Sequence, residues 1–448
     1  MPTSHPQPAR TLPKDPHIDS TLGLLTDGYE FISKRVRALD TDAFAARFLT
    51  HDVICVTGAA AAREFYDTRL FERADVMPGR IRHTLVGEGG VQGLDGEAHA
   101  HRKAAFMSLM TPESIADLVR VAGRRWDTSI AHWQERDQIE LLCESQYVLC
   151  RAACTWAGVS LPDFEVSART RDLAAMVDAF GGVGWRNWRG RWARTRAELW
   201  IRSMIERVRG RTFTAPANSA LALWTWQRDR DGNLLPSKVA AVELLNVLRP
   251  IVAVSNFIAF AAAALIKYPE YRQRLRAGEK DLDECFVHEV RRYYPFAPFV
   301  GARTRTAFES ATGYRLPQDQ LVILDIYGTN RDARLWQNPD KFFPERFTKR
   351  AIGAFDYLPQ GGGDPSIGHR CAGEWITIAL MRQAVRMLAQ CVTFEVPVQD
   401  LSFRLSRLPT YPGSGVCLGN VRQQRSVCDL APDLPAAAEC PAKMRRLK

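Results

Sequence analysis

The chain has 448 residues, of which 46% are hydrophobic and 25% charged, and this composition is typical of a soluble globular protein. Ten cysteines at irregular spacings, and a polar start without a signal-peptide pattern, exclude a disulfide framework and predict a reducing, cytoplasmic location. The net charge of +10 favours acidic ligands, but no basic tail interleaved with aromatic residues indicates a nucleic-acid partner. The longest apolar run, residues 251–266, is too short for a comfortable transmembrane span and predicts a buried helix.

Helical periodicity dominates the chain, in the order that follows. We expect a flexible arm over residues 1–20, one catalytic domain over 21–422 and a disordered tail over 423–448. Apolar spacing predicts helices over residues 22–39, 42–48, 59–66, 99–110, 113–134, 139–157, 167–180, 237–267, 271–278, 281–294 and 375–392. Short strands are predicted over 51–57, 300–306 and 321–325, and around Phe394 and Phe403. With no repeat and no linker, the fold class is mainly α, a single domain with small β-sheets.

Residues 185–211 are dense in tryptophan and arginine. The favoured interpretation is a solvated basic helix whose tryptophans face the core. The alternative is a surface that meets acidic lipid or gathers anionic substrate. The sequence is compatible with both, and it leaves a peripheral membrane contact open.

A glycine-rich loop, GGGDPSIGHRCAGE, spans residues 361–374 and is followed at once by a helical pattern. Glycines allow the backbone to pass close to a bulky flat group. Cys371 would lie at the mouth of the helix, where free N–H groups favour a thiolate, and such a thiolate is what an axial haem ligand requires. A buried structural cysteine is the more common outcome for an isolated Cys. Zinc is disfavoured, because only His369 stands nearby as a second ligand.

Two charged features lie upstream of this loop. Glu289 and Arg292 are three residues apart, so they share a helix face and can pair with each other and with a third partner. Arg249 and Pro250 interrupt the longest apolar helix, where an unpaired ion would cost several kcal/mol. The partner of Arg249 is therefore either a remote acidic side chain or an anionic ligand.

In this order, the motifs resemble those of the cytochrome P450 family. The resemblance is carried by Glu289-x-x-Arg292, by Pro344-Glu345-Arg346-Phe347 and by the loop that ends in Gly368-His369-Arg370-Cys371-Ala372-Gly373. It implies a haem b with a Cys371 thiolate as axial ligand, buried between a long distal helix and the proximal Cys loop. The loop is longer than is usual in the family and has Tyr357 where a Phe is common.

Arg249-Pro250 stands where most cytochromes P450 carry an acid–alcohol pair for protonating dioxygen. This departure is similar to the fatty-acid peroxygenase branch, which uses hydrogen peroxide and needs no redox partner. Several N-terminal stretches resemble the same branch, namely residues 65–68, 91–96, 99–103 and 109–112.

The resemblance implies that Arg249 holds the substrate carboxylate in a bidentate pair, and that this carboxylate is the general acid–base. Arg249 itself keeps its proton. The implied reaction is hydroxylation of medium- or long-chain fatty acids at position 2, or at positions 2 and 3. The alternatives are a decarboxylase that makes terminal alkenes and a conventional monooxygenase that needs a redox partner. A haem sensor without catalysis is the least favoured.

The resemblance also implies roles for other residues. Gln92 would lie over the haem, where branch members that favour decarboxylation tend to carry His, so Gln favours hydroxylation. The substrate channel would be lined by Leu85, Val86, Phe296 and Phe299. The haem propionates would be bound by His99 and Lys103, together with Arg73 and His369. Glu289 and Arg292 would be structural. Chain-length preference, stereochemistry and oligomeric state stay open.

Overall fold

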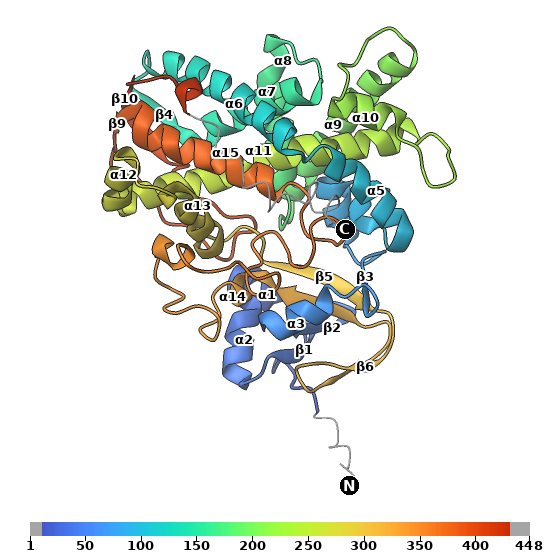
Figure 1. Ribbon diagram of the computed structural model, residues 1–448. Coiled ribbons are helices and arrows are strands. Elements are labelled where there is room, and N and C mark those ends of the chain that lie inside the picture. Colours follow the sequence, from blue (N-terminus) through green and yellow to red (C-terminus); the bar gives the residue numbers. More distant parts are fainter. Residues whose placement is uncertain (1–10, 431–448) are drawn as a thin grey trace.

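The computed structural model describes residues 11–430, which form a large helical region and a smaller region around a sheet (Figure 1). The α-helices are α1 (Thr21–Asp27), α2 (Phe31–Leu39), α3 (Gly58–Phe65), α4 (Gly79–Ile81), α5 (Gly96–Ser108), α6 (Pro112–Trp133), α7 (Leu141–Ala157), α8 (Asp163–Asp178), α9 (Trp185–Arg209), α10 (Ala220–Trp226), α11 (Ser237–Lys267), α12 (Pro269–Arg276), α13 (Leu282–Tyr293), α14 (Ile326–Thr329) and α15 (Glu374–Arg386). The mainly helical fold with small sheets confirms the predicted class.

Three small sheets complete the described part. The largest has the strand order β1-β2-β8-β5-β3, the second has the order β4-β10-β9, and the third pairs β6 with β7. The strands are β1 (Ala43–Phe48), β2 (His51–Val56), β3 (Phe71–Glu72), β4 (Gln138–Glu140), β5 (Phe299–Thr304), β6 (Phe308–Glu309), β7 (Arg315–Leu316), β8 (Leu321–Asp325), β9 (Val392–Glu395) and β10 (Cys417–Gln423).

Strand β1 corrects the helix predicted over residues 42–48. It pairs antiparallel with β2. Phe44, Ala46 and Phe48 pack into a cluster with Phe31 of α2, whereas Ala43 packs into a different cluster. This alternation has the period of a strand. The error arose because Phe44 and Phe48 are also four apart, and so short an apolar run fits either period.

The two expected loose ends are anchored where the structure describes them. The N–H of Ala45 donates to the carbonyl of Pro13 (2.8 Å), and the N–H of Ser20 donates to that of Arg47 (2.7 Å). Residues 13–20 thus follow the free edge of β1, whose backbone groups need partners. At the other end, the N–H of Gln424 donates to the carbonyl of Cys391, and Val427 is buried. The remaining parts, 1–10 and 431–448, lie outside the described residues.

The C-terminal sheet corrects a second prediction. β9 confirms the strand around Phe394, but no strand forms around Phe403 in the described structure. Phe403 instead packs edge-on against Phe260 and Tyr294. The partner of β9 is β10, which pairs on its other side with β4. An aromatic residue packed on distant helices looks like a strand residue in the sequence alone.

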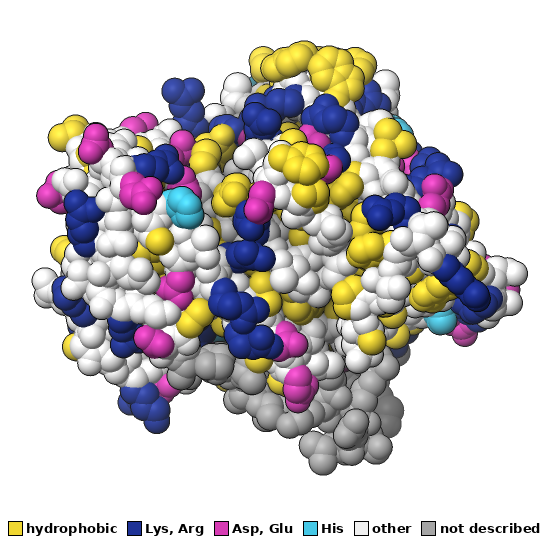
Figure 2. Space-filling model, turned by 90° about the horizontal axis from the view of Figure 1, so that it is seen from above, with side chains coloured by type: hydrophobic (Ala, Val, Ile, Leu, Met, Phe, Trp, Pro, Cys, Tyr) yellow, Lys and Arg dark blue, Asp and Glu magenta, His cyan; other side chains and the backbone are white. Residues whose placement is uncertain are grey.

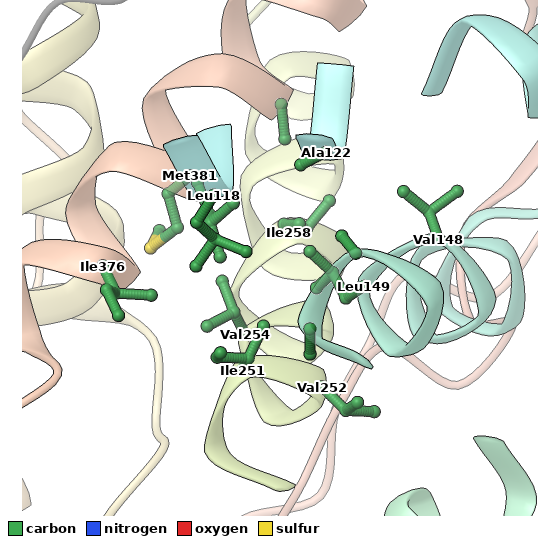
Figure 3. Packing of buried hydrophobic residues seen from close by; sticks show 14 of the residues in the cluster. Leu118, Ala122, Val148, Leu149, Ile251, Val252, Val254, Ile258, Ile376 and Met381 are labelled. Carbon is green, nitrogen blue, oxygen red and sulfur yellow. The ribbon is translucent and has the colours of Figure 1, made fainter. Parts of the chain in front are cut away.

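Helix α11 is the core of the molecule, and its bounds match the prediction. Around its Ile251, Val254 and Ile258, Figure 3 shows apolar side chains from three other helices, which are Leu118 and Ala122 (α6), Val148 and Leu149 (α7), and Ile376 and Met381 (α15). A helix that is apolar all round must be buried. By length and composition α11 could span a membrane, but 83% of its most apolar window is buried inside the protein. It continues through Pro250 and carries Arg249 into the interior.

Helix α9 corrects the favoured interpretation of the tryptophan- and arginine-rich segment. Trp185, Trp188 and Trp192 do not face the core, since each is more than half exposed. The core-facing positions of α9 are occupied by smaller residues, among them Ala193, Ala197 and Ile201. Close packing on α8 and α11 leaves little room for indoles on that side, so the tryptophans lie on the outer face.

Candidate active site

The loop before α15 presents Cys371 through backbone contacts. The N–H of Cys371 donates to the carbonyl of Gln360 (3.0 Å). Gly361 has φ +97°, and a Cβ there would lie 3.0 Å from the Tyr66 hydroxyl oxygen. A Cβ at Gly362 would lie 2.9 Å from the Ala354 carbonyl oxygen. The glycines are therefore required for the turn and for its close approach to Tyr66.

The electrostatics of Cys371 differ from the prediction. Burial raises the pKa of its thiol, and the positive charge of Lys103 and the N–H of Gly373 only partly oppose this. The helix starts at Glu374, three residues beyond the sulfur. Its N-terminus therefore does not by itself favour the thiolate, and deprotonation has to come with binding of a metal.

Gln360 is a contact to the sulfur that sequence reasoning missed. Its Nε2 lies 3.7 Å from Cys371 Sγ and also donates to Thr377 Oγ1 (3.0 Å). Its Oε1 accepts from Arg291 (2.9 Å), which also pairs with Glu374. Arg291 and Arg370 lower the pKa of Glu374 to about 2, although burial opposes them. A single Gln beside a glycine run carries no motif, so only the folded loop reveals this contact.

The pair Glu289–Arg292 is formed as predicted. Both nitrogens of a bidentate contact lie 2.8 Å from the carboxylate, and both side chains are buried. Arg346, from the Pro-Glu-Arg-Phe stretch, is the third partner, at 3.1 Å from Glu289. Arg292 also donates to three carbonyls, those of Asn330, Pro339 and Lys341. This network joins α13 to the segment that precedes the Cys loop.

The four predicted propionate ligands are gathered around the same loop. His99 and His369 have ring centroids 4.0 Å apart, and the Lys103 Nζ donates to the Arg370 carbonyl (2.5 Å). Arg73 is buried, and its charge acts on both histidines. Burial lowers the pKa of His99 to about 3 and that of Lys103 to about 8. Such a set of buried nitrogen groups suits an anionic partner.

Arg249 lies in the middle of α11 and is 7% exposed. Its Nε is buried without a hydrogen-bond partner, and one terminal nitrogen lies 3.5 Å from Asn246 Oδ1. No carboxylate of residues 11–430 forms an ion pair with it. Burial lowers its pKa to about 9; the charge of Arg194 adds to this and that of Cys371 opposes it. It is therefore a protonated, under-satisfied cation within electrostatic reach of Cys371.

Asn246 connects Arg249 to the loops above α11. Its Nδ2 donates to the carbonyl of Val86 (2.9 Å) and lies 3.3 Å from both Gln92 Oε1 and Glu243 Oε2. Three acceptors around Nδ2 leave Oδ1 to face Arg249. Gln92, predicted to be near the reacting centre, is thus two hydrogen bonds away from Arg249. The carboxylate of Glu243 is paired to Arg102 of α5 (2.7 Å).

The predicted channel residues divide into two groups. Val86 is buried and Leu85 is half-buried in a turn beside α11, where Arg194 of α9 donates to the Leu85 carbonyl (2.8 Å). Phe296 stacks on Phe257 of α11, at 4.3 Å between centroids. Phe299 differs from these, because it lies in β5 and packs against the cluster of Phe31 and Phe44. Strand alternation directs it to the sheet region, so its contacts do not join it to Arg249.

The residues present fit a haem. A soft sulfur ligand is held by a glycine loop, and buried nitrogen groups stand where two carboxylates need partners. Arg73 also has a buried terminal nitrogen without a hydrogen-bond partner. Within residues 11–430 no group of three or more His, Cys, Asp or Glu side chains could hold a metal ion directly. A single protein ligand suits an iron whose other equatorial positions are filled by a porphyrin.

Comparisons with known proteins agree with this site. The family model "Cytochrome P450" matches residues 282–409. The putative cytochrome P450 138 of Mycobacterium tuberculosis is 22% identical over 395 residues, 83% of this chain and 88% of that protein. Cytochrome P450 4e5 of Drosophila mettleri is 28% identical, but the chain spans only 33% of its length, and it spans 23% of cytochrome P450 3A40 of Oryzias latipes.

Solved structures match over nearly the whole chain. Cytochrome P450EX alpha with myristic acid is 40% identical, covers 92% of this chain and 100% of its own, and has a TM-score of 0.89. Cytochrome P450SP alpha in complex with (R)-ibuprofen is 44% identical, with coverages of 91% and 99% and a TM-score of 0.88. A variant of cytochrome P450 OleT with arachidonic acid is 35% identical, with coverages of 92% and 99% and a TM-score of 0.89. The chain therefore belongs to the cytochrome P450 family, within the fatty-acid peroxygenase branch represented by these structures.

Proposed function

We propose that the protein uses hydrogen peroxide to hydroxylate medium- or long-chain fatty acids at position 2, or at positions 2 and 3. The observation that carries this proposal is Arg249. A buried guanidinium without an acidic partner in the described chain is costly, and an anionic substrate would remove that cost. The ligands named with the three similar structures are myristic acid, arachidonic acid and ibuprofen, and all three are carboxylic acids.

The haem would be held by Cys371 from below and by the cation set of Arg73, His99, Lys103 and His369 at its edge. When bound, it supplies the redox chemistry that activates peroxide and transfers oxygen. Gln360 would donate to the ligating sulfur and so adjust its electron density. The buried ion pairs around Glu289 and Glu374 would keep this proximal loop rigid.

Arg249 would bind both oxygens of the substrate carboxylate. Its pKa of about 9 keeps it protonated at neutral pH, so it can hold the anion but cannot act as a base. The carboxylate itself would take the proton from one peroxide oxygen and return it to the other. Asn246 would orient Arg249, and Pro250 directly follows it in α11. Binding of the substrate thus completes the acid–base machinery.

Gln92 bears on the choice between hydroxylation and decarboxylation. Its amide is engaged by Asn246 and has no titratable proton. A side chain of this kind cannot deliver or remove a proton during the reaction. We therefore favour hydroxylation as the main outcome, with terminal-alkene formation as the second candidate.

The experiment is incubation of the haem-loaded protein with myristic acid and hydrogen peroxide, followed by mass spectrometry. We expect 2-hydroxymyristic acid, or a mixture with the 3-hydroxy acid. A terminal alkene as the main product would establish the decarboxylase instead. Product formation with ferredoxin, reductase and NAD(P)H, but none with peroxide, would show that a redox partner is needed. Bound fatty acid without product in either assay would support a sensor.

We also propose a reducing compartment such as the cytoplasm. None of the nine cysteines in the described part of the chain forms a disulfide, and several are fully buried. This absence suits a reducing environment.

A further inference from the structure

Helix α9 has two apolar faces on opposite sides. The buried face contacts α8, α10 and α11; it is formed by Gly190, Ala193, Ala197, Ile201, Met204, Ile205 and Val208. The outer face carries Trp185, Trp188, Trp192 and Leu199, which are 67%, 52%, 51% and 61% exposed. We name these four residues the α9 stripe. An ordinary surface helix has one apolar face and one polar face, so the stripe is unexplained by packing of the described residues.

The four stripe residues share one line along the helix. At about 100° per residue, their side chains fall within roughly 60° of one another, opposite to the buried residues. Trp185 and Trp192 are in edge contact, with ring centroids 5.4 Å apart. The guanidinium of Arg191 lies 5.3 Å from the ring of Trp188. The indoles are therefore ordered in advance, which lowers the entropy cost of binding a partner.

Arginines border the stripe on both sides. By the same helical geometry, Arg189 and Arg196 lie along one edge and Arg191 and Arg202 along the other. The side chains of Arg189 and Arg196 are 50% and 55% exposed, whereas their partners Asp178 and Asp172 are only 14% and 6% exposed. The acids thus lie beneath and the cations face outward. Figure 2 shows Lys and Arg side chains beside exposed hydrophobic ones on the face seen from above, where α8 and α9 lie.

We infer that the α9 stripe docks on the surface of an anionic phospholipid bilayer. Tryptophan prefers the boundary between apolar and aqueous phases, and arginine binds lipid phosphates. Charge complementarity favours this occupant over a second copy of the chain, because self-docking would bring rows of arginines together. The net charge of +10 acts in the same direction.

The opposite side of α9 contacts the proposed active site. Arg194, on that side, donates to the carbonyls of Leu85 (2.8 Å) and Val86 (3.5 Å). A lipid surface at the stripe would thus lie one helix away from the loop over Arg249. The inference itself does not depend on the proposed reaction, because it is tested by binding.

The test is co-sedimentation of the haem-loaded full chain with vesicles of phosphatidylglycerol, compared with vesicles of phosphatidylcholine. We expect binding to the anionic vesicles that weakens with added salt, and little binding to the neutral ones. The triple variant Trp185→Ala, Trp188→Ala, Trp192→Ala should lose affinity about tenfold or more. Arg191→Gln should lose roughly fivefold. The matched control is Trp226→Ala, because Trp226 on α10 is 53% exposed but lies outside the stripe, and it should bind like the wild type.

Unchanged haem absorbance and circular dichroism of the triple variant show that it is folded. Three results would overturn the inference. The wild type sediments with neither kind of vesicle, or the folded triple variant binds as well as the wild type. In the third, sedimentation velocity shows a wild-type dimer that the triple variant abolishes, which would assign the stripe to self-association.

Discussion

Two buried arginines of this protein, Arg292 and Arg249, are in opposite states. Arg292 has a bidentate carboxylate partner at 2.8 Å and three backbone carbonyls. Arg249 has one long contact to Asn246 and a buried Nε without a partner. Both are almost fully buried, so both would incur the same desolvation cost on folding.

The difference separates structure from function. Every donor that the network gives to Arg292 is internal, so the protein holds it in place without any ligand. Arg249 has been left for something that arrives later. A folded chain keeps an under-satisfied buried group only where that group has another use. Five experiments can break or sharpen this contrast.

The largest effect should follow Arg249→Ala. Without the guanidinium the substrate carboxylate is neither held nor positioned to move the peroxide proton. We expect peroxide-driven hydroxylation to fall by roughly 10²–10⁴-fold. Product is measured by mass spectrometry, and an unchanged haem spectrum is the control for folding. Activity close to that of the wild type would remove the carboxylate anchor from the proposal.

Stability should respond in the opposite order. Arg292→Leu leaves the buried Glu289 without its bidentate partner and should lower the free energy of unfolding by about 3–5 kcal/mol. Arg249→Leu removes an unpaired buried cation and should leave that free energy unchanged or raise it. Denaturant unfolding of both variants at equal haem content measures the contrast. Equal destabilisation would mean that Arg249 has a structural partner after all.

Substrate affinity should depend on the charge of Arg249. Its pKa is lowered from 12.5 to about 9, so the side chain loses its proton as pH rises through about 9. Affinity for a fatty acid should then fall by up to about tenfold per pH unit above that value. The lowered pKa also means that the charged form destabilises the fold below about pH 9, and that this cost eases at higher pH.

The measurement is a fatty-acid titration followed by the haem spectrum. A fatty alcohol of equal chain length is the control, because it has no carboxylate and its affinity should stay constant. A parallel fall for both ligands would show general unfolding and not the titration of Arg249.

A several-fold change in product ratio should follow Gln92→His. Histidine can exchange a proton near neutral pH, so the alkene share should rise relative to the hydroxy acid. Gln92→Leu is the matched control, since it removes the contact to Asn246 without adding an acid–base group. If both variants give the wild-type ratio, Gln92 does not set the outcome.

The smallest effect should follow Gln360→Leu on the proximal side. Loss of one weak hydrogen bond to Cys371 Sγ, worth about 1 kcal/mol, should lower the haem reduction potential and shift its absorbance slightly. Thr377→Val removes the other acceptor of the same amide and should leave both properties unchanged. An identical potential in all three proteins would exclude tuning by Gln360.

Local periodicity and motifs determined much of this protein in advance. The bounds of α11 and β8 match the prediction, because long apolar or β-branched runs have only one way to be buried. The pairing of Glu289 with Arg292 also follows from their spacing on one helix turn. The isolation of Arg249 was one of two outcomes that the sequence allowed.

Tertiary structure alone decided the rest. Residues 43–48 became a strand because β2 and α2 surround them, and residues 13–20 were anchored by the edge of that strand. Trp185, Trp188 and Trp192 turned outward because small residues of α9 fit against its neighbours. Gln360 reached the sulfur through a loop with no motif. In each case the deciding contact comes from a segment distant in the chain, and local spacing carries no information about which segment that will be.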